Sequence, residues 1–136
     1  MKKLFSENNS KKEVEPARIS RAALLSALEA SRNVFPNEFI GLFREKEGVL
    51  CELVLPPFSE YGPDSSGFVD WHLPLDSSLK ASFHSHPGWS NLPSEQDLSF
   101  FQKTYLTHFI ACRPYAPSST ACYSRQGEVK KVLLVD

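Results

Sequence analysis

Two histidines and an aspartate lie close together in the segment 84–97, and their types and spacing suit one metal ion. His84 and His86 are separated by one residue, and in an extended strand such side chains point to the same face. Pro87 favours a break before a helical pattern begins, and Asp97 falls one turn into that helix. Two imidazoles and one carboxylate leave a fourth tetrahedral position for water, as in catalytic zinc sites. The segment therefore predicts a zinc-dependent hydrolytic site.

A glutamate upstream of this segment is the candidate general base. Glu38 is the first residue of a predicted strand and lies on the same face of it as Ile40 and Leu42. A carboxylate at the end of this otherwise apolar face is a candidate for the rim of a site. Other glutamates compete for the role: they are Glu45, Glu47, Glu52 and Glu60. The apolar strand around Glu38 favours it over these rivals.

The same residues resemble the signature of a known family. His-x-His, seven residues, Ser, two residues and Asp is the pattern of the JAMM metalloproteases, also called the MPN-plus or Mov34/PAD-1 family. His84, His86, Ser94 and Asp97 match this pattern without a gap. The family also has an upstream glutamate followed by Gly and apolar residues on a strand, and residues 38–43 resemble that element. The resemblance covers most of the chain.

The resemblance implies a role for each matched residue. His84, His86 and Asp97 would hold zinc. Glu38 would act as general acid and base, and Ser94 would donate a hydrogen bond to the tetrahedral oxyanion. The bond cleaved in this family is typically an isopeptide between the C-terminal glycine of a ubiquitin-like protein and a lysine. The expected partners are therefore conjugates of a ubiquitin-like or sulfur-carrier-type modifier, and the small chain resembles the free-standing prokaryotic members.

Four other functions or metals are compatible with some of these residues. A peptidase that trims the tail of a small carrier protein would use the same site, and the sequence does not separate the two. A non-catalytic MPN scaffold is disfavoured because such scaffolds lack the metal ligands. A nucleobase deaminase would need His-x-Glu and Pro-Cys-x-x-Cys, which this chain lacks. Two histidines and a carboxylate also suit Fe(II), but the glutamate and serine favour hydrolytic zinc.

Ordinary structural roles also explain several of these residues. Ser94 followed three positions later by Asp97 is a helix-capping pattern, and Ser94 can serve both as cap and as hydrogen-bond donor. His72 and His108 have no partner at ligand spacing and are predicted to be structural. Trp89 has two open interpretations, as a packing anchor or as a wall of the substrate groove.

Composition points to one domain and excludes some partners. The chain has 136 residues, is 41% hydrophobic and 23% charged, and carries a formal charge of −1. This balance gives no electrostatic reason to expect binding to nucleic acid or to a membrane surface. Three cysteines without Cys-x-x-Cys spacing suit a reducing cytoplasm, and Cys112 and Cys122 are predicted to be free buried thiols. The oligomeric state is not predicted.

The helix and strand patterns around these residues predict an α/β fold with a mixed β-sheet and flanking helices. The resemblance implies the MPN (JAB1/MPN) fold, which is related to that of cytidine deaminases. Residues 1–16 are predicted to be a flexible tail and residues 17–136 the catalytic domain. The predicted helices are 20–31 and 94–104, and the predicted strands are 38–45, 49–55, 68–73, 79–84, 108–112, 120–124 and 129–135. Residues 56–66 are predicted to be a loop.

Overall fold

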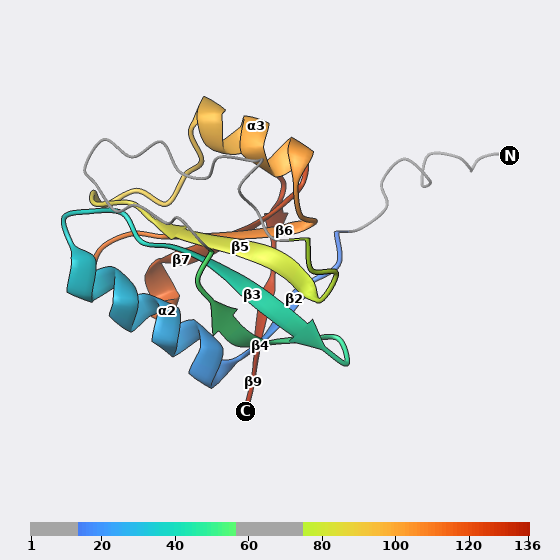
Figure 1. Cartoon of the computed structure of the whole chain (residues 1–136). Helices are drawn as coiled ribbons and strands as arrows, with labels where there is room; N and C mark the ends of the chain where they lie inside the picture. Colours follow the sequence, from blue (N-terminus) through green and yellow to red (C-terminus); the bar gives the residue numbers. More distant parts are fainter. Residues whose placement is uncertain (1–13, 57–74) are drawn as a thin grey trace, which may run out of the picture.

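The computed structural model describes residues 14–56 and 75–136, whose strands form one eight-stranded mixed sheet. In chain order the elements are β2 (Ala17–Ser20), α2 (Arg21–Val34), β3 (Ile40–Lys46), β4 (Val49–Val54), β5 (Leu79–Ser85), α3 (Glu95–Lys103), β6 (Thr107–Ala111), the 3₁₀ turn η2 (Pro117–Ser119), β7 (Thr120–Ser124), β8 (Val129–Lys130) and β9 (Val132–Val135). Helix α2 covers one face of the sheet and α3 lies over the other (Figure 1). The predicted α/β class, with helices flanking a mixed sheet, is confirmed.

The strand order is β8-β7-β6-β5-β3-β4-β2-β9, which puts β5 and β3 in the middle. Strand β3 runs antiparallel to both β4 and β5, whereas β5 and β6 are parallel. The hairpin between β3 and β4 turns at Glu47 and Gly48, which both have positive φ. A two-residue turn with two positive φ values matches the twist of antiparallel strands and therefore closes hairpins well.

Helix α2 begins where the sequence predicts it. The Ser20 hydroxyl accepts a hydrogen bond from the Ala23 amide at 3.1 Å, which satisfies one of the free N–H groups of the first turn. The apolar side of the helix is buried against the sheet; its buried residues are Ala23, Leu24, Ala27, Leu28 and Ser31. The helix continues to Val34, three residues beyond the predicted end.

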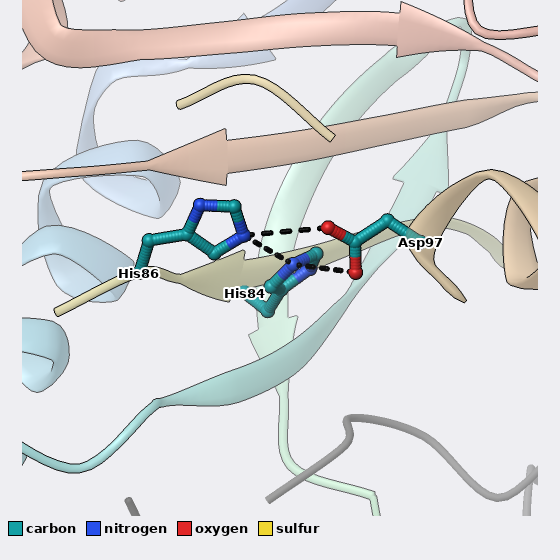
Figure 2. A group of neighbouring side chains, drawn as sticks. All are labelled: His84, His86 and Asp97. Atoms are coloured by element: carbon teal, nitrogen blue, oxygen red, sulfur yellow. Dashed lines mark hydrogen bonds and ion pairs between the residues drawn. The ribbon is translucent and has the colours of Figure 1, made fainter. Parts of the chain in front are cut away.

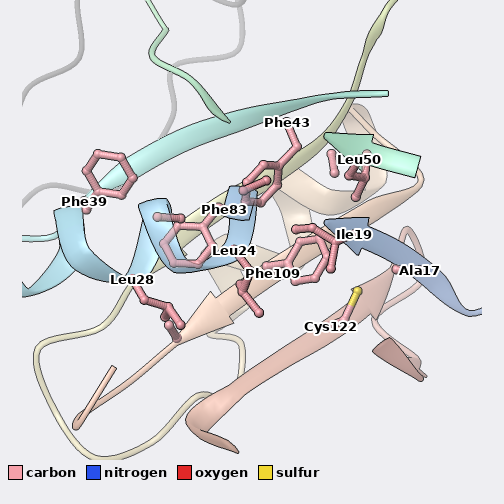
Figure 3. Packing of buried hydrophobic residues seen from close by; sticks show 14 of the residues in the cluster. Ala17, Ile19, Leu24, Leu28, Phe39, Phe43, Leu50, Phe83, Phe109 and Cys122 are labelled. Atoms are coloured by element: carbon pink, nitrogen blue, oxygen red, sulfur yellow. The ribbon is translucent and has the colours of Figure 1, made fainter. Parts of the chain in front are cut away.

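Four phenylalanines form the centre of the core between the sheet and α2 (Figure 3). Phe43 packs edge-on against Phe83 and Phe109, with ring centroids 6.0 and 5.5 Å apart. Phe39 continues the cluster, 6.0 Å from Phe83. Edge-to-face pairs of this kind add about 0.5–1.5 kcal/mol each beyond the burial of their area. This aromatic cluster fixes the central strands of the sheet relative to one another.

The opposite face, beneath α3, has a smaller apolar core and more polar groups. Phe101 of α3 packs there against Ile110 and Tyr123. His108 lies fully buried beside them, stacked on Phe101 with ring centroids 4.1 Å apart, and its Nδ1 is 2.6 Å from the Ser82 hydroxyl. These contacts give His108 the structural role predicted for it.

One prediction about the end of the chain was wrong, and one strand near its start was missed. Residues 129–135 do not form one strand, because the chain leaves the sheet at Lys131: β8 stays beside β7, while β9 pairs with β2 at the opposite edge. The strand β2 itself was not predicted, since four residues are too short to show a clear alternation. It pairs in parallel with β9, from Ala17 opposite Val132 to Ser20 opposite Val135.

Some predictions fall outside the described residues. These are most of the predicted tail 1–16, the strand 68–73 with His72, and nearly all of the loop 56–66. The three cysteines are described and are free; Cys112 and Cys122 are buried, as predicted, and Cys51 is exposed. Within residues 14–56 and 75–136, no helix reaches the length and hydropathy that crossing a membrane takes.

Candidate active site

The two predicted metal-binding histidines stand at the end of β5, on the face that α3 covers. His84 is in the strand and His86 follows it by two residues, so both rings project to the same side. Their Nε2 atoms are 3.2 Å apart. Asp97, from the first turn of α3, places Oδ1 3.2 Å from His84 Nε2 and Oδ2 3.3 Å from His86 Nε2. The three side chains point toward one another (Figure 2), as a metal site requires.

Asp97 reaches the histidines because a helix cap fixes it. The Ser94 hydroxyl accepts a hydrogen bond from the Asp97 amide at 3.0 Å, and Asp97 Oδ2 accepts one from the Ser94 amide at 2.9 Å. This reciprocal pair is a capping box, and the positive end of the helix dipole also favours a carboxylate in the first turn. The capping interpretation is therefore correct, and it is compatible with a ligand role because Asp97 contacts both histidines as well.

The Asp97 carboxylate and the His86 imidazole shift each other's pKa values. Burial alone would raise the pKa of Asp97, but hydrogen bonds with His84 and His86 outweigh it and hold the pKa of this carboxyl well below its usual range. Burial likewise opposes protonation of His86, yet its bonds with Asp97 and the Ser90 carbonyl leave its pKa raised. The His86 Nδ1 lies 3.0 Å from that carbonyl oxygen. Such a partner fixes the ring so that Nε2 faces the cluster.

Glu38 precedes β3, two residues before the strand begins, and lies beside the cluster of His84, His86 and Asp97. Ile40 is paired with His84 across the β3–β5 ladder, so the chain immediately before β3 runs next to the end of β5. Burial raises the pKa of Glu38, with His84 and His86 lowering it and Asp97 raising it further. Glu38 is thus within electrostatic reach of all three candidate ligands.

The described rivals of Glu38 lie elsewhere. Glu45 is near the far end of β3 and Glu47 is in the exposed hairpin turn. Glu52 is exposed on β4 and forms an ion pair with Arg44 at 2.9 Å. Glu60 is outside the described residues. Among these described glutamates, the structure therefore brings only Glu38 to the cluster of His84, His86 and Asp97.

Ser94 occupies the N-cap of α3 at the mouth of the cluster and is exposed. Its bond with the Asp97 amide uses an acceptor lone pair, so the hydroxyl hydrogen is left to donate. Cap and hydrogen-bond donor are therefore compatible roles for this serine.

Residues of β6 and of the turn after it hold the chain at His86, and the sequence gives no sign of them. The His86 amide donates to the Ala111 carbonyl at 2.8 Å, and the Tyr115 hydroxyl donates to the His86 carbonyl at 2.8 Å. Arg113 Nε donates to the Pro87 carbonyl, also at 2.8 Å. These residues are separated by 25 or more positions from their partners, and no local spacing in the sequence signals such contacts.

Trp89 stands in the loop between the ligands with 71% of its surface exposed, so it is not a buried packing anchor. The Arg113 guanidinium lies 5.3 Å from its ring centroid and 4.4 Å from that of Phe35. Two aromatic rings therefore flank one cation beside the candidate site, a favourable arrangement for a guanidinium.

Comparisons with known proteins agree with this geometry. The family described as prokaryotic homologs of the JAB domain matches residues 20–125. A relative from Haloferax volcanii, named a probable metalloprotease, is 31% identical over 128 residues, which cover 87% of this chain and 79% of the relative. The matched range includes every residue of the candidate site.

Solved structures give the same result. A JAB1/MPN domain protein from Archaeoglobus fulgidus is 35% identical with a TM-score of 0.71, over 88% of this chain and 99% of that one. A structure described as JAMM, a metalloprotease-like zinc site in the proteasome and signalosome, is 33% identical with a TM-score of 0.70, over 89% and 99% of the two chains. The predicted MPN fold is confirmed. The chain belongs to the prokaryotic JAB-domain family, within the JAMM (MPN-plus) metalloproteases.

Proposed function

We propose that this protein is a zinc-dependent isopeptidase that releases a ubiquitin-like or sulfur-carrier-type modifier from a target lysine. The observation that carries the proposal is the convergence of His84, His86 and Asp97, with Glu38 beside them. A scaffold without catalytic activity has no need for three ligand side chains gathered around one point. The family relationship supports a metallopeptidase, and the choice of an isopeptide substrate is the step beyond it.

The donor set fits zinc. Zn²⁺ holds nitrogen and oxygen ligands at about 2.0–2.1 Å, so neighbouring ligands at the corners of a tetrahedron stand about 3.3 Å apart. The histidine nitrogens are 3.2 Å apart, and each carboxylate oxygen of Asp97 lies close to one of them: Oδ1 is 3.2 Å from His84 Nε2 and Oδ2 is 3.3 Å from His86 Nε2. One ligand atom from each residue lies within 4.8 Å of the others, so the three side chains can share one ion. Three protein ligands leave one corner for water, which is the arrangement of a hydrolytic centre.

Each remaining residue has a task defined by its chemistry. When bound, zinc supplies a Lewis acid that brings the pKa of water down to about 7. Glu38 accepts a proton from the attacking water and later delivers it to the leaving lysine amine. Ser94 donates a hydrogen bond to the oxygen of the scissile carbonyl as negative charge develops there. The products are a free carboxylate on the modifier and a free amine on the target.

The test compares lysates of the source cells treated with the zinc-loaded wild type or with Glu38→Gln. Mass spectrometry would search for small proteins ending in Gly-Gly that only the wild type releases, and for lysines freed on their former targets. Glu45→Gln is the matched control, since it makes the same change in the same stretch of chain but away from the cluster. We expect Glu38→Gln to retain zinc and lose release, and Glu45→Gln to behave as the wild type.

Three outcomes would change this conclusion. Release of a shortened carrier protein without any freed lysine would assign the alternative activity, peptidase trimming of a C-terminal tail. A fully active Glu38→Gln protein would remove Glu38 from the mechanism. A zinc-loaded wild type that cleaves nothing would contradict the isopeptidase proposal.

A further inference from the structure

Ser85, the residue between the two histidines, points to the opposite face of the sheet and is fully buried. Its hydroxyl oxygen accepts a hydrogen bond from the Phe39 amide at 2.8 Å. Its own amide donates to the Phe39 carbonyl at 3.0 Å. Both polar backbone groups of Phe39 are therefore bonded to one residue, and Phe39 is the neighbour of Glu38 in the chain.

The bond from the Phe39 amide departs from the regular pattern of a sheet. In a hydrogen-bonded antiparallel pair, two facing residues exchange N–H···O=C bonds through their carbonyls. The ladder between β3 and β5 ends with Ile40 opposite His84, and Phe39 and Ser85 form the next pair along. Here the Ser85 hydroxyl accepts the bond that a carbonyl takes in a regular ladder. A side chain thus extends the pairing by one residue, toward Glu38.

From this we infer that Ser85 is a positioning residue, which holds Glu38 in place beside the metal-binding cluster through the Phe39 backbone. The inference rests on the proposed function, because it gives Ser85 a part in the work of Glu38. The Phe39 side chain is also fixed, since it is buried and packs 6.0 Å from Phe83. The backbone and the side chain of Phe39 are therefore both fixed, and Glu38 is joined to Phe39 by a single peptide bond.

Because side chains alternate along a strand, residues 84–86 can contact both the candidate metal site and the segment that bears Glu38. His84 and His86 present their nitrogens to the α3 face, while Ser85 reaches through the other face to the segment that bears Glu38. The metal ligands and the proposed base are thereby placed by adjacent residues of the same strand. A displacement of about 1 Å of a catalytic group can reduce turnover on the order of 100-fold, so such placement matters.

The test uses three substitutions of Ser85 and one control. Ser85→Ala removes the acceptor, Ser85→Cys keeps a similar volume with a weaker acceptor, and Ser85→Thr restores the hydroxyl. The control is Ser82→Ala, which removes another fully buried hydroxyl of β5, one bonded to His108 and not to Phe39. If Ser85→Ala does not fold, Ser85→Cys carries the comparison.

The readouts are the zinc content, the hydrogen-exchange rate of the Phe39 amide, the NMR signal of the Glu38 carboxyl carbon, and kcat and KM for release of the modifier. We expect Ser85→Ala and Ser85→Cys to keep zinc, to speed exchange at Phe39, to shift the Glu38 signal, and to lower kcat about 10-fold or more with KM little changed. Ser85→Thr should recover most of the turnover, and Ser82→Ala should lose stability with kcat unchanged.

A double-substituted protein separates positioning from general stability. In the Glu38→Gln background, Ser85→Ala should cause no further loss of the residual turnover, measured at high enzyme concentration, because residues that act through one another are not additive. Zinc loss in parallel with activity would overturn the inference, since Ser85 would then act on the ligands. Unchanged kcat in Ser85→Ala, or a further loss in the Glu38→Gln background, would overturn it too. If the wild type releases nothing, the proposed function fails alone, and the Phe39 exchange and Glu38 signal still decide whether Ser85 positions Glu38.

Discussion

We predict that His108 makes the protein lose stability in mild acid. Its ring is fully buried, with Nδ1 2.6 Å from the Ser82 hydroxyl and Nε2 2.8 Å from the Tyr105 carbonyl. A neutral ring protonated on Nε2 satisfies both contacts, since it donates to the carbonyl and accepts from the hydroxyl. Burial lowers the pKa of His108 to about 4, and the bond to the Tyr105 carbonyl offsets only part of this effect.

The size and sign of the effect follow from linkage. The pKa of His108 falls from 6.5 in the unfolded chain to about 4 in the folded protein. At about 1.4 kcal/mol per unit, this difference is worth about 3 kcal/mol of unfolding free energy. Between these two pH values the unfolded chain binds a proton that the folded protein does not. The contribution is therefore complete above pH 6.5, declines as the pH falls, and is lost near pH 4.

The assay is urea unfolding of the wild type and of His108→Gln at a series of pH values across this window. The other titrating groups of the chain are present in both proteins, so the difference in unfolding free energy isolates His108. We expect the advantage of the wild type over His108→Gln to shrink by about 3 kcal/mol between neutral pH and pH 4. Ser82→Ala is the control, since it keeps the titrating ring. A gap that stays constant with pH would refute the reasoning.

Three further predictions concern the ligand, the core and a turn. Asp97→Ala should reduce bound metal to background by elemental analysis, and lose about 1 kcal/mol of stability because the Ser94 amide loses its carboxylate acceptor; full metal content would exclude Asp97 as a ligand. Phe109→Ala should lower the unfolding free energy by about 3–5 kcal/mol in urea, because the ring is fully buried; a cost below about 1 kcal/mol would contradict its central place. Gly127→Ala should cost about 1–2 kcal/mol, because φ is +86° and a Cβ would lie 2.6 Å from Leu98 Cδ2; an unchanged melting temperature would contradict this.

Local spacing was sufficient to predict that His84, His86 and Asp97 come together. The i, i+2 rule places His84 and His86 on one face without any knowledge of the rest of the sheet. The cap of α3 is also local, since Ser94 and Asp97 are three residues apart. Glu38 could be proposed from its own strand, although its approach to the cluster depends on the pairing of β3 with β5.

Contacts between distant parts of the chain could not be predicted in this way. Nothing near Tyr115 signals that its hydroxyl bonds the carbonyl of His86, because the sheet alone brings them together. The same holds for β9, whose apolar residues favour a strand but do not select a partner. The bond between Ser85 and Phe39 is of this kind as well, since it spans 46 positions in the chain.

The shared use of Asp97 has a consequence for the mechanics of the fold. A cation held by His84, His86 and Asp97 would tie the end of β5 to the start of α3, and so close the segment between them into a ring, much as a disulfide closes a loop. Unlike a disulfide, such a tie exists only in the folded protein, and it stabilises the fold because the ion binds the folded state and not the unfolded chain. Because the Asp97 carboxylate also caps α3, the cross-link ends on the helix terminus itself. Loss of the ion would therefore remove a brace that ends on the first turn of the helix, and the capping box alone would then hold that turn.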